Sequence, residues 1–214
     1  MRRSAALILT GLSFFCGCCK PNADMRGEEQ RPAVAMELPR AIRSRLDAAG
    51  WSDRVGDQLA LWVSVERQAL FGIEKGGVRF VYSCSTAAKG TGNKVNSNQT
   101  PLGWHRIDER IGSGLPLGAV FDERVFTGEV WTPDSPTAKD LILTRIMWLR
   151  GLEDGVNAGP GIDSHDRYIY IHGTPAEARL GCPASHGCIR LSNRHAADLF
   201  DRTAEGTLVL ITDW

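Results

Sequence analysis

The chain lacks several features that would assign it at once to a familiar class of protein. It has no net charge, because 25 lysines and arginines balance 25 aspartates and glutamates. It also has no basic stripe and no acidic tract, so neither nucleic-acid binding nor a disordered solvating tail is expected. Internal repeats and low-complexity tracts are absent as well. The 214 residues suffice for one domain with a sizeable core plus appendages.

The apolar run near the N-terminus is too short to span a bilayer as a stable helix. It covers Ala5–Phe15, follows Arg2 and Arg3, and is followed by small or polar residues. This order is typical of a secretory signal peptide rather than of a transmembrane anchor. We therefore expect a signal peptide over residues 1–19 and a mature chain in the periplasm.

Cysteines follow that run directly, in the segment Phe15-Cys16-Gly17-Cys18. The segment resembles a bacterial lipobox, although Phe15 stands where leucine is usual. Lipid attachment at Cys18 would anchor the chain to the membrane, and ordinary signal cleavage nearby is the alternative. Residues 20–37 are polar and show no apolar period, so we expect a tether there.

The remaining sequence predicts a mainly β domain. Its 23 glycines and dispersed apolar residues are typical of a turn-rich β protein. Residues 38–57 are expected to hold an N-terminal helix, since apolar residues recur at helical spacing over Leu38–Trp51. The domain proper is expected over residues 58–214. Alternation and turn signals predict strands over 59–65, 69–74, 78–85, 104–110, 141–149, 168–172, 189–191 and 208–211, and a helix over 195–203 capped by Ser192 or Asn193.

The most distinctive stretch is Ser185-His186-Gly187-Cys188, which brings a thiol and an imidazole together. A thiol is a strong nucleophile only as thiolate, and a neighbouring imidazole is the usual means of removing its proton near neutral pH. His186 lies in the same turn as Cys188, whereas His172 ends a predicted strand and would be held more rigidly. We therefore favour His172 as the base. The backbone N–H groups of Gly187 and Cys188 are natural donors to a developing oxyanion.

Two segments carry a resemblance to a known family. They are Tyr170-Ile171-His172-Gly173-Thr174 and Ser185-His186-Gly187-Cys188-Ile189-Arg190-Leu191. Together they resemble the signature of the L,D-transpeptidases, the YkuD-type catalytic domain. A weaker similarity to that family's upstream segment runs through residues 83–92 and Thr100-Pro101-Leu102-Gly103. The resemblance covers residues 58–211.

The resemblance implies a fold and a reaction. The fold would be a mainly β, YkuD-like sandwich of mixed sheets with a short helix after the catalytic turn. Cys188 would attack the carbonyl of the L-centre of diaminopimelate in a peptidoglycan tetrapeptide stem, form a thioester and release D-Ala. An amine of another stem would then resolve the thioester. His172 would act as base and then as acid, oriented by the carbonyl of Gly173. The same chemistry implies that carbapenems acylate Cys188.

The same resemblance implies supporting roles for three other residues. His186 would shape the pocket or assist the substrate beside the oxyanion donors. Ser185 and Arg190 would brace the turn and bind the carboxylates of the stem, because a guanidinium matches carboxylate geometry. Peptidoglycan stems would be the partners of a monomer, and neither a metal nor an organic cofactor is implied. With water or a lipoprotein lysine as acceptor, the enzyme would instead be an L,D-carboxypeptidase or would attach lipoproteins to the wall.

Two other kinds of function remain as alternatives. A wall-binding module without activity is one, although the intact histidine and cysteine argue against it. A zinc site is the other, since His172, Cys182, His186 and Cys188 offer the nitrogen and sulfur ligands that zinc takes. Their spacing is irregular, and a closed four-ligand site would consume the nucleophile.

The pairing of the later cysteines is open at this stage. Cys84, which stands where the family more often has an aliphatic residue, can pair with Cys182 in an oxidising compartment, and either can pair with Cys188. A bridge between Cys84 and Cys182 is preferred, because it would leave Cys188 free.

Overall fold

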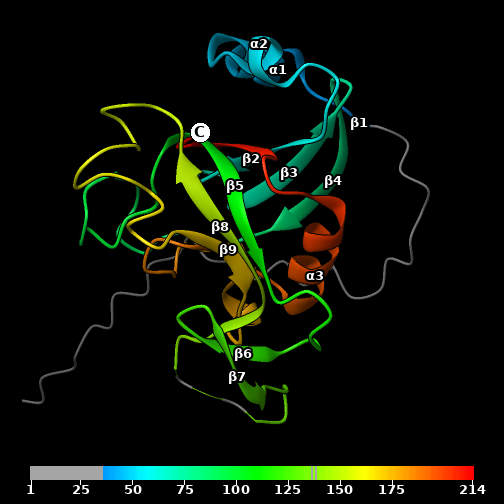
Figure 1. The fold of residues 1–214 in the computed structure, drawn as a ribbon. Helices are drawn as coiled ribbons and strands as arrows, with labels where there is room; N and C mark the ends of the chain where they lie inside the picture. Colours follow the sequence, from blue (N-terminus) through cyan, green and yellow to red (C-terminus); the bar gives the residue numbers. More distant parts are fainter. Residues whose placement is uncertain (1–35, 136, 138) are drawn as a thin grey trace, which may run out of the picture.

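The computed structural model describes residues 36–135, 137 and 139–214 (Figure 1). The signal peptide, the lipidation site at Cys18 and most of the tether expected over 20–37 lie outside the described residues. None of the described helices has the length and apolar character needed to cross a membrane. Strands make up 38% of the structure and helices 15%, which confirms the mainly β class.

All strands belong to one mixed sheet with the order β1-β4-β3-β2-β11-β5-β8-β6-β7, from which β9 and β10 branch at β8. The pairs β2–β11 and β9–β10 are parallel and the others are antiparallel. The mixed strand pairing agrees with the mainly β, YkuD-like fold expected from the sequence, and the long pairing of β5 with β8 joins the two halves of the sheet. The strands are β1 Met36–Glu37, β2 Ala60–Ser64, β3 Ala69–Glu74, β4 Gly77–Ser83, β5 Gly103–Ile111, β6 Ala119–Asp122, β7 Val125–Val130, β8 Ile142–Gly151, β9 Tyr170–Gly173, β10 Ile189–Leu191 and β11 Leu208–Thr212.

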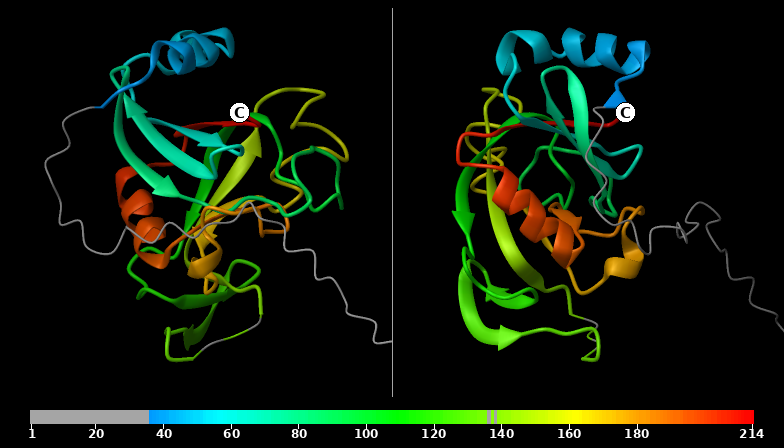
Figure 2. Two further views of the ribbon diagram at one scale, coloured as in Figure 1. Left: turned by 180° about the vertical axis from the view of Figure 1, so that it is seen from behind. Right: turned by 90° about the vertical axis from the view of Figure 1, so that its right-hand side faces the viewer.

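The central strand β2 is buried along its whole length because both of its faces are covered. Leu61 and Val63 pack into the core that also holds the apolar side of α3 (Asn193–Arg202). Trp62 lies in a second core together with residues of α1 (Arg40–Ala48) and α2 (Trp51–Val55). Each buried leucine or valine contributes roughly 1.5–3 kcal/mol. As Figures 1 and 2 show, α1 and α2 lie at one end of the molecule and the β6–β7 hairpin lies at the opposite end.

Two elements differ from those predicted and a third was not predicted, and each has a residue with positive φ. One helix was predicted over residues 38–57, but the structure has two there, because Gly50 (φ +81°) adopts the left-handed conformation between α1 and α2. Residues 120–131, which alternate only loosely, form a hairpin that turns at Glu123 (φ +53°). The strand predicted to begin at Tyr168 begins at Tyr170, since Tyr168 has φ +56° and lies in a turn.

The remaining predicted elements are present within a few residues of their expected limits. The strands β2, β3 and β4, each predicted from the sequence, form an antiparallel meander. Ser192 caps α3, its Oγ accepting the N–H of His195 at 3.1 Å. A short 3₁₀ helix, η1 (Glu177–Arg179), precedes the cysteine-bearing turn.

Candidate active site

The parallel pair β9–β10 brings His172 and Cys188 to neighbouring segments. His172 pairs in register with Arg190, and Cys188 lies directly before β10. The Cys188 Sγ accepts the N–H of Tyr170 at 3.4 Å and directs its own S–H to the carbonyl of Tyr168 at 3.5 Å. The backbone at the start of β9 therefore fixes the direction of the thiol.

His172 is held in one tautomer by its neighbour. Its Nδ1 lies 2.7 Å from the carbonyl oxygen of Gly173, the contact that the resemblance led us to expect. A carbonyl only accepts, so Nδ1 carries the hydrogen and Nε2 keeps a lone pair. Burial lowers the pKa of His172 to about 4. The imidazole is therefore neutral at physiological pH and can accept a proton at Nε2.

Cys188 rests as a thiol rather than as a thiolate. Its side chain is half-buried, and burial raises its pKa to about 11, although the N–H of Tyr170 and the charge of Arg190 act in the opposite direction. The Sγ and the imidazole of His172 do not hydrogen-bond to each other. Attack by this sulfur therefore requires removal of its proton as the new bond forms.

An ion pair beside both groups was not foreseen from the sequence. The carboxylate of Asp140 pairs with the guanidinium of Arg190, whose side chain is only 6% exposed. The same Oδ2 lies 2.9 Å from Nδ1 of His186, a side chain that is 71% exposed. Arg190 lowers the pKa of both Cys188 and His172, and Asp140 raises both, so the pair lies within electrostatic reach of the thiol and the imidazole.

These contacts change the expected roles of Arg190 and His186. Arg190 was expected to bind a carboxylate of the substrate, but its guanidinium is buried against a carboxylate of the protein itself. The exposed His186 has its Nδ1 against Asp140, so the protein itself engages one nitrogen of this imidazole. Asp140 lies in a polar stretch before β8 that carries no motif. Its charge is therefore the only feature of the sequence that could have suggested a role at the site.

Ser185 and Thr100 brace the cysteine turn. The buried Ser185 hydroxyl donates to the carbonyl of Cys188 at 2.6 Å and accepts the N–H of Gly187 at 3.2 Å. Thr100 donates from below to the carbonyl of Gly187 at 2.9 Å. Gly187 has φ +134°, and a Cβ there would lie 3.1 Å from a methyl group of Ile169.

The turn corrects two further expectations. The Ser185 hydroxyl is engaged within the turn, so it is not open to a stem carboxylate. The N–H of Gly187 is engaged as well. Among the described residues the N–H of Cys188 has no hydrogen-bond acceptor, which leaves it as the one free donor of the two expected for an oxyanion.

The cysteines are not paired as preferred from the sequence. Cys84 is a free thiol in the main core, fully buried, and burial raises its pKa strongly. The preferred Cys84–Cys182 bridge is therefore wrong, because Cys84 is a free thiol in the core while Cys182 is disulfide-bonded. Cys188 is free.

The zinc set considered from the sequence is not gathered. His172 hydrogen-bonds to the carbonyl of Gly173, His186 hydrogen-bonds to Asp140, and Cys182 is disulfide-bonded. The described residues do bring metal-ligating atoms within 4.8 Å of one another at a different place, in Asp108, Glu109 and His165.

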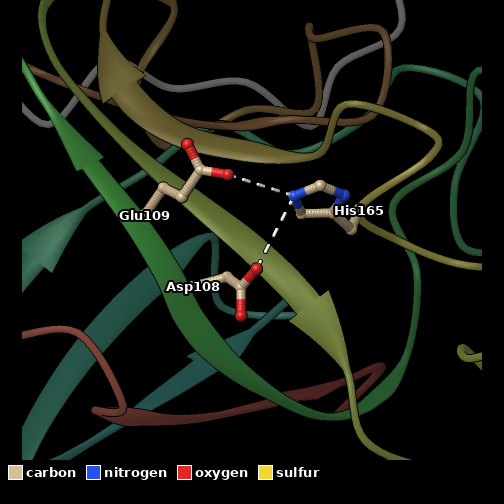
Figure 3. A group of neighbouring side chains, drawn as sticks. All are labelled: Asp108, Glu109 and His165. Carbon is tan, nitrogen blue, oxygen red and sulfur yellow. Dashed lines mark ion pairs between the residues drawn. The ribbon is translucent and has the colours of Figure 1, made fainter.

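Figure 3 shows that second group, in which the Nε2 of His165 lies 3.6 Å from a carboxylate oxygen of both Asp108 and Glu109. The Asp108 carboxylate already pairs with Arg106 at 2.9 Å and with Arg150 at 2.8 Å. These two guanidinium groups balance its charge and lower its pKa. The two arginines therefore account for the Asp108 carboxylate, and we assign no metal to the group.

Known proteins with similar sequences or structures share one description. The chain is 36% identical over 97 residues to the probable L,D-transpeptidase ErfK/SrfK of Salmonella typhimurium, a match that covers 42% of this chain but only 30% of that protein. Similar solved structures include the L,D-transpeptidase of Mycobacterium smegmatis, with 18% identity, a TM-score of 0.43 and coverage of 72% of this chain and 58% of that one. Another is the L,D-transpeptidase of Xylanimonas cellulosilytica, with 19% identity, a TM-score of 0.44 and coverage of 82% and 71%.

The family model of the YkuD L,D-transpeptidase catalytic domain matches residues 58–211, which is most of the chain. These residues contain β2 through β11 and both segments that carry Cys188 and His172. The chain belongs to the YkuD family of L,D-transpeptidase catalytic domains.

Proposed function

We propose that this protein is a peptidoglycan L,D-transpeptidase that acts through a thioester on Cys188. The observation that carries the proposal is the pairing of β9 with β10, which sets a neutral His172 with a free Nε2 beside a half-buried thiol. The substrate would be a tetrapeptide stem, the class on which the family acts.

Acylation of Cys188 is the first half of the proposed reaction. The sulfur attacks the carbonyl carbon of the L-centre of diaminopimelate while its proton passes to Nε2 of His172. The N–H of Cys188 donates to the oxyanion that forms. The C–N bond to D-Ala then breaks, and the imidazolium returns the proton to the leaving amine. Burial makes this imidazolium a strong acid, which favours that second transfer.

Transfer to an acceptor amine completes the reaction. The amine of a second stem attacks the thioester carbonyl and gives a proton to His172. The C–S bond breaks, and the sulfur leaves with that proton, so the thiol and the neutral imidazole are restored. Water in place of the amine would give an L,D-carboxypeptidase, and a lipoprotein lysine would give attachment to the wall.

Export would bring the domain to its substrate. A signal peptide over residues 1–19 would deliver it to the periplasm, where peptidoglycan lies. Lipidation of Cys18 would hold it at the membrane, with residues 20–37 as the tether. The residues described at the site require no cofactor for the proposed steps.

Incubation with purified tetrapeptide muropeptides, followed by mass spectrometry of the products, tests the proposal. Cross-linked dimers would support a transpeptidase, and tripeptides alone would identify a carboxypeptidase. No change in either product would overturn both. The control is Cys188→Ala, which should abolish turnover while the protein still binds peptidoglycan.

A further inference from the structure

The charges of Arg190 and Arg167 lower the pKa of Cys188, and Arg124 contacts Tyr170, whose backbone N–H donates to the Cys188 sulfur. Arg190 is buried against Asp140. Arg167 donates to the carbonyls of Gly92 at 3.1 Å and Gln99 at 2.7 Å, and thereby holds the loop before β5. The Arg190 side chain is only 6% exposed, and hydrogen bonds to three loop residues hold the Arg167 guanidinium in place. The third arginine, Arg124, differs in this respect.

Arg124 lies in the turn of the β6–β7 hairpin and keeps unused donors. Its NH1 donates to the phenol oxygen of Tyr170 at 3.1 Å, and its guanidinium lies 4.7 Å from the ring centre of Trp148 and 5.0 Å from that of Tyr168. Its one ion pair, with Glu123 at 3.4 Å, is weak because that carboxylate is 76% exposed. The Arg124 side chain is 28% exposed, and a guanidinium has five N–H donors.

The residues that hold Arg124 also touch the nucleophile. Tyr170 contacts Arg124 with its phenol and the Cys188 Sγ with its backbone N–H. Tyr168, over whose ring Arg124 lies, accepts the S–H of Cys188 at its carbonyl, and its own side chain is 54% exposed. Phe121 of the hairpin belongs to the apolar cluster against which Cys188 packs. Tyr170 alone therefore separates the Arg124 guanidinium from the thiol.

We propose that Arg124 binds a carboxylate of the donor stem and so selects and positions the substrate. This inference rests on the proposed function. A tetrapeptide stem carries two free carboxylates close to the bond that breaks, one on the terminal D-Ala and one on diaminopimelate. A planar guanidinium held beside two aromatic rings is restricted in its motion, and it can donate two parallel hydrogen bonds to such a carboxylate.

Steady-state kinetics with three tetrapeptides tests the inference: the free stem, the stem amidated at D-Ala, and the stem amidated at diaminopimelate. Arg124→Gln should lower kcat/KM for the free stem by about 10- to 100-fold, mainly through KM, as expected for a charge-assisted hydrogen bond. One of the two amidated stems lacks the carboxylate that Arg124 binds. With that stem, Arg124→Gln should cause no further loss of kcat/KM. Arg124→Lys should recover part of the loss. Equal losses with all three substrates, or no loss with any, would overturn the inference.

A binding measurement separates this inference from the proposed function. In the Cys188→Ala background, which forms no thioester, Arg124→Gln should weaken binding of the free stem by a similar factor, measured by calorimetry. The matched control is Arg79→Gln, which removes an arginine with a weak ion pair on β4 and should leave binding unchanged. If the Cys188→Ala protein binds the free stem equally well with Arg124 and with Gln, Arg124 has no such role, whatever the activity of the wild type.

Discussion

The carboxylate of Asp140 accepts a hydrogen bond from the buried guanidinium of Arg190. The same oxygen lies 2.9 Å from the exposed imidazole of His186. Arg190 is paired in register with His172 and follows the cysteine turn. A single carboxylate before β8 therefore connects the turn that carries the thiol with β10, the neighbour of the strand that carries His172.

Replacing that carboxylate should change the acidity of the thiol. In Asp140→Asn, the pKa of Cys188 is expected to fall, because the negative charge that raises it is lost while Arg190 remains. The pH dependence of Cys188 alkylation by iodoacetamide, with Cys188→Ala as the blank, measures this. Asp57→Asn, an exposed acid in the N-terminal region, serves as control and should not shift the profile. An unchanged midpoint of the alkylation profile in Asp140→Asn would argue against electrostatic coupling between Asp140 and Cys188.

The wild-type thiol should titrate at unusually high pH. Burial raises the pKa of Cys188 to about 11, so alkylation should still be accelerating above pH 9. Cys84 should stay silent in the folded protein because it is fully buried. Unfolding in urea should return the thiol to a pKa of about 8.5. A rate that is already maximal at pH 7 would reveal a preformed thiolate–imidazolium pair and contradict the neutral resting state.

The two histidines should respond differently to the same substitution. His172→Gln is expected to slow acylation by about 100- to 10,000-fold, the usual contribution of a general acid–base group. His186→Gln should cost less than about 10-fold, because this side chain is 71% exposed and pairs only with Asp140. Single-turnover acylation rates would distinguish them. The opposite order of effects would make His186 the base.

Gly173 should not tolerate a side chain. A Cβ there would lie 2.5 Å from Oδ1 of Asn193 and 2.9 Å from the carbonyl oxygen of Leu143. Gly173→Ala is expected to destabilise the fold by about 1–3 kcal/mol through overpacking and to displace the carbonyl that orients His172. Thermal unfolding and the acylation rate measure the two effects. Gly155→Ala, at an open position with φ +75°, should show only a smaller loss of stability and normal activity.

The chemistry of the site was predictable where a residue type and its local setting agree. Cys188 stands next to a glycine and a histidine, and His172 ends a segment of strong β character, so both could be named from short windows of sequence. The strands β2 to β4 were predictable for the same reason, because alternation and a Gly-Gly turn lie close together. Family resemblance added the substrate class and the role of the Gly173 carbonyl.

The contacts that depend on distant parts of the chain were not predictable. Asp140 forms an ion pair with Arg190 only because β8 and β10 both flank β9. No local sequence pattern predicts that strand pairing. Arg190 was assigned to the substrate because its charge was visible and its burial was not. Arg124 was missed because its hairpin turns at Glu123, a non-glycine residue with positive φ, which leaves no turn signal in the sequence.

The central claim is that a stem tetrapeptide acylates Cys188. Intact-protein mass spectrometry after brief mixing with the tetrapeptide tests it most directly. The predicted result is an added mass equal to the tetrapeptide less D-Ala, which is the free tripeptide less one water. This adduct should be lost on adding hydroxylamine and be absent in Cys188→Ala. Products formed without any such adduct, or an adduct that persists in Cys188→Ala, would contradict the claim.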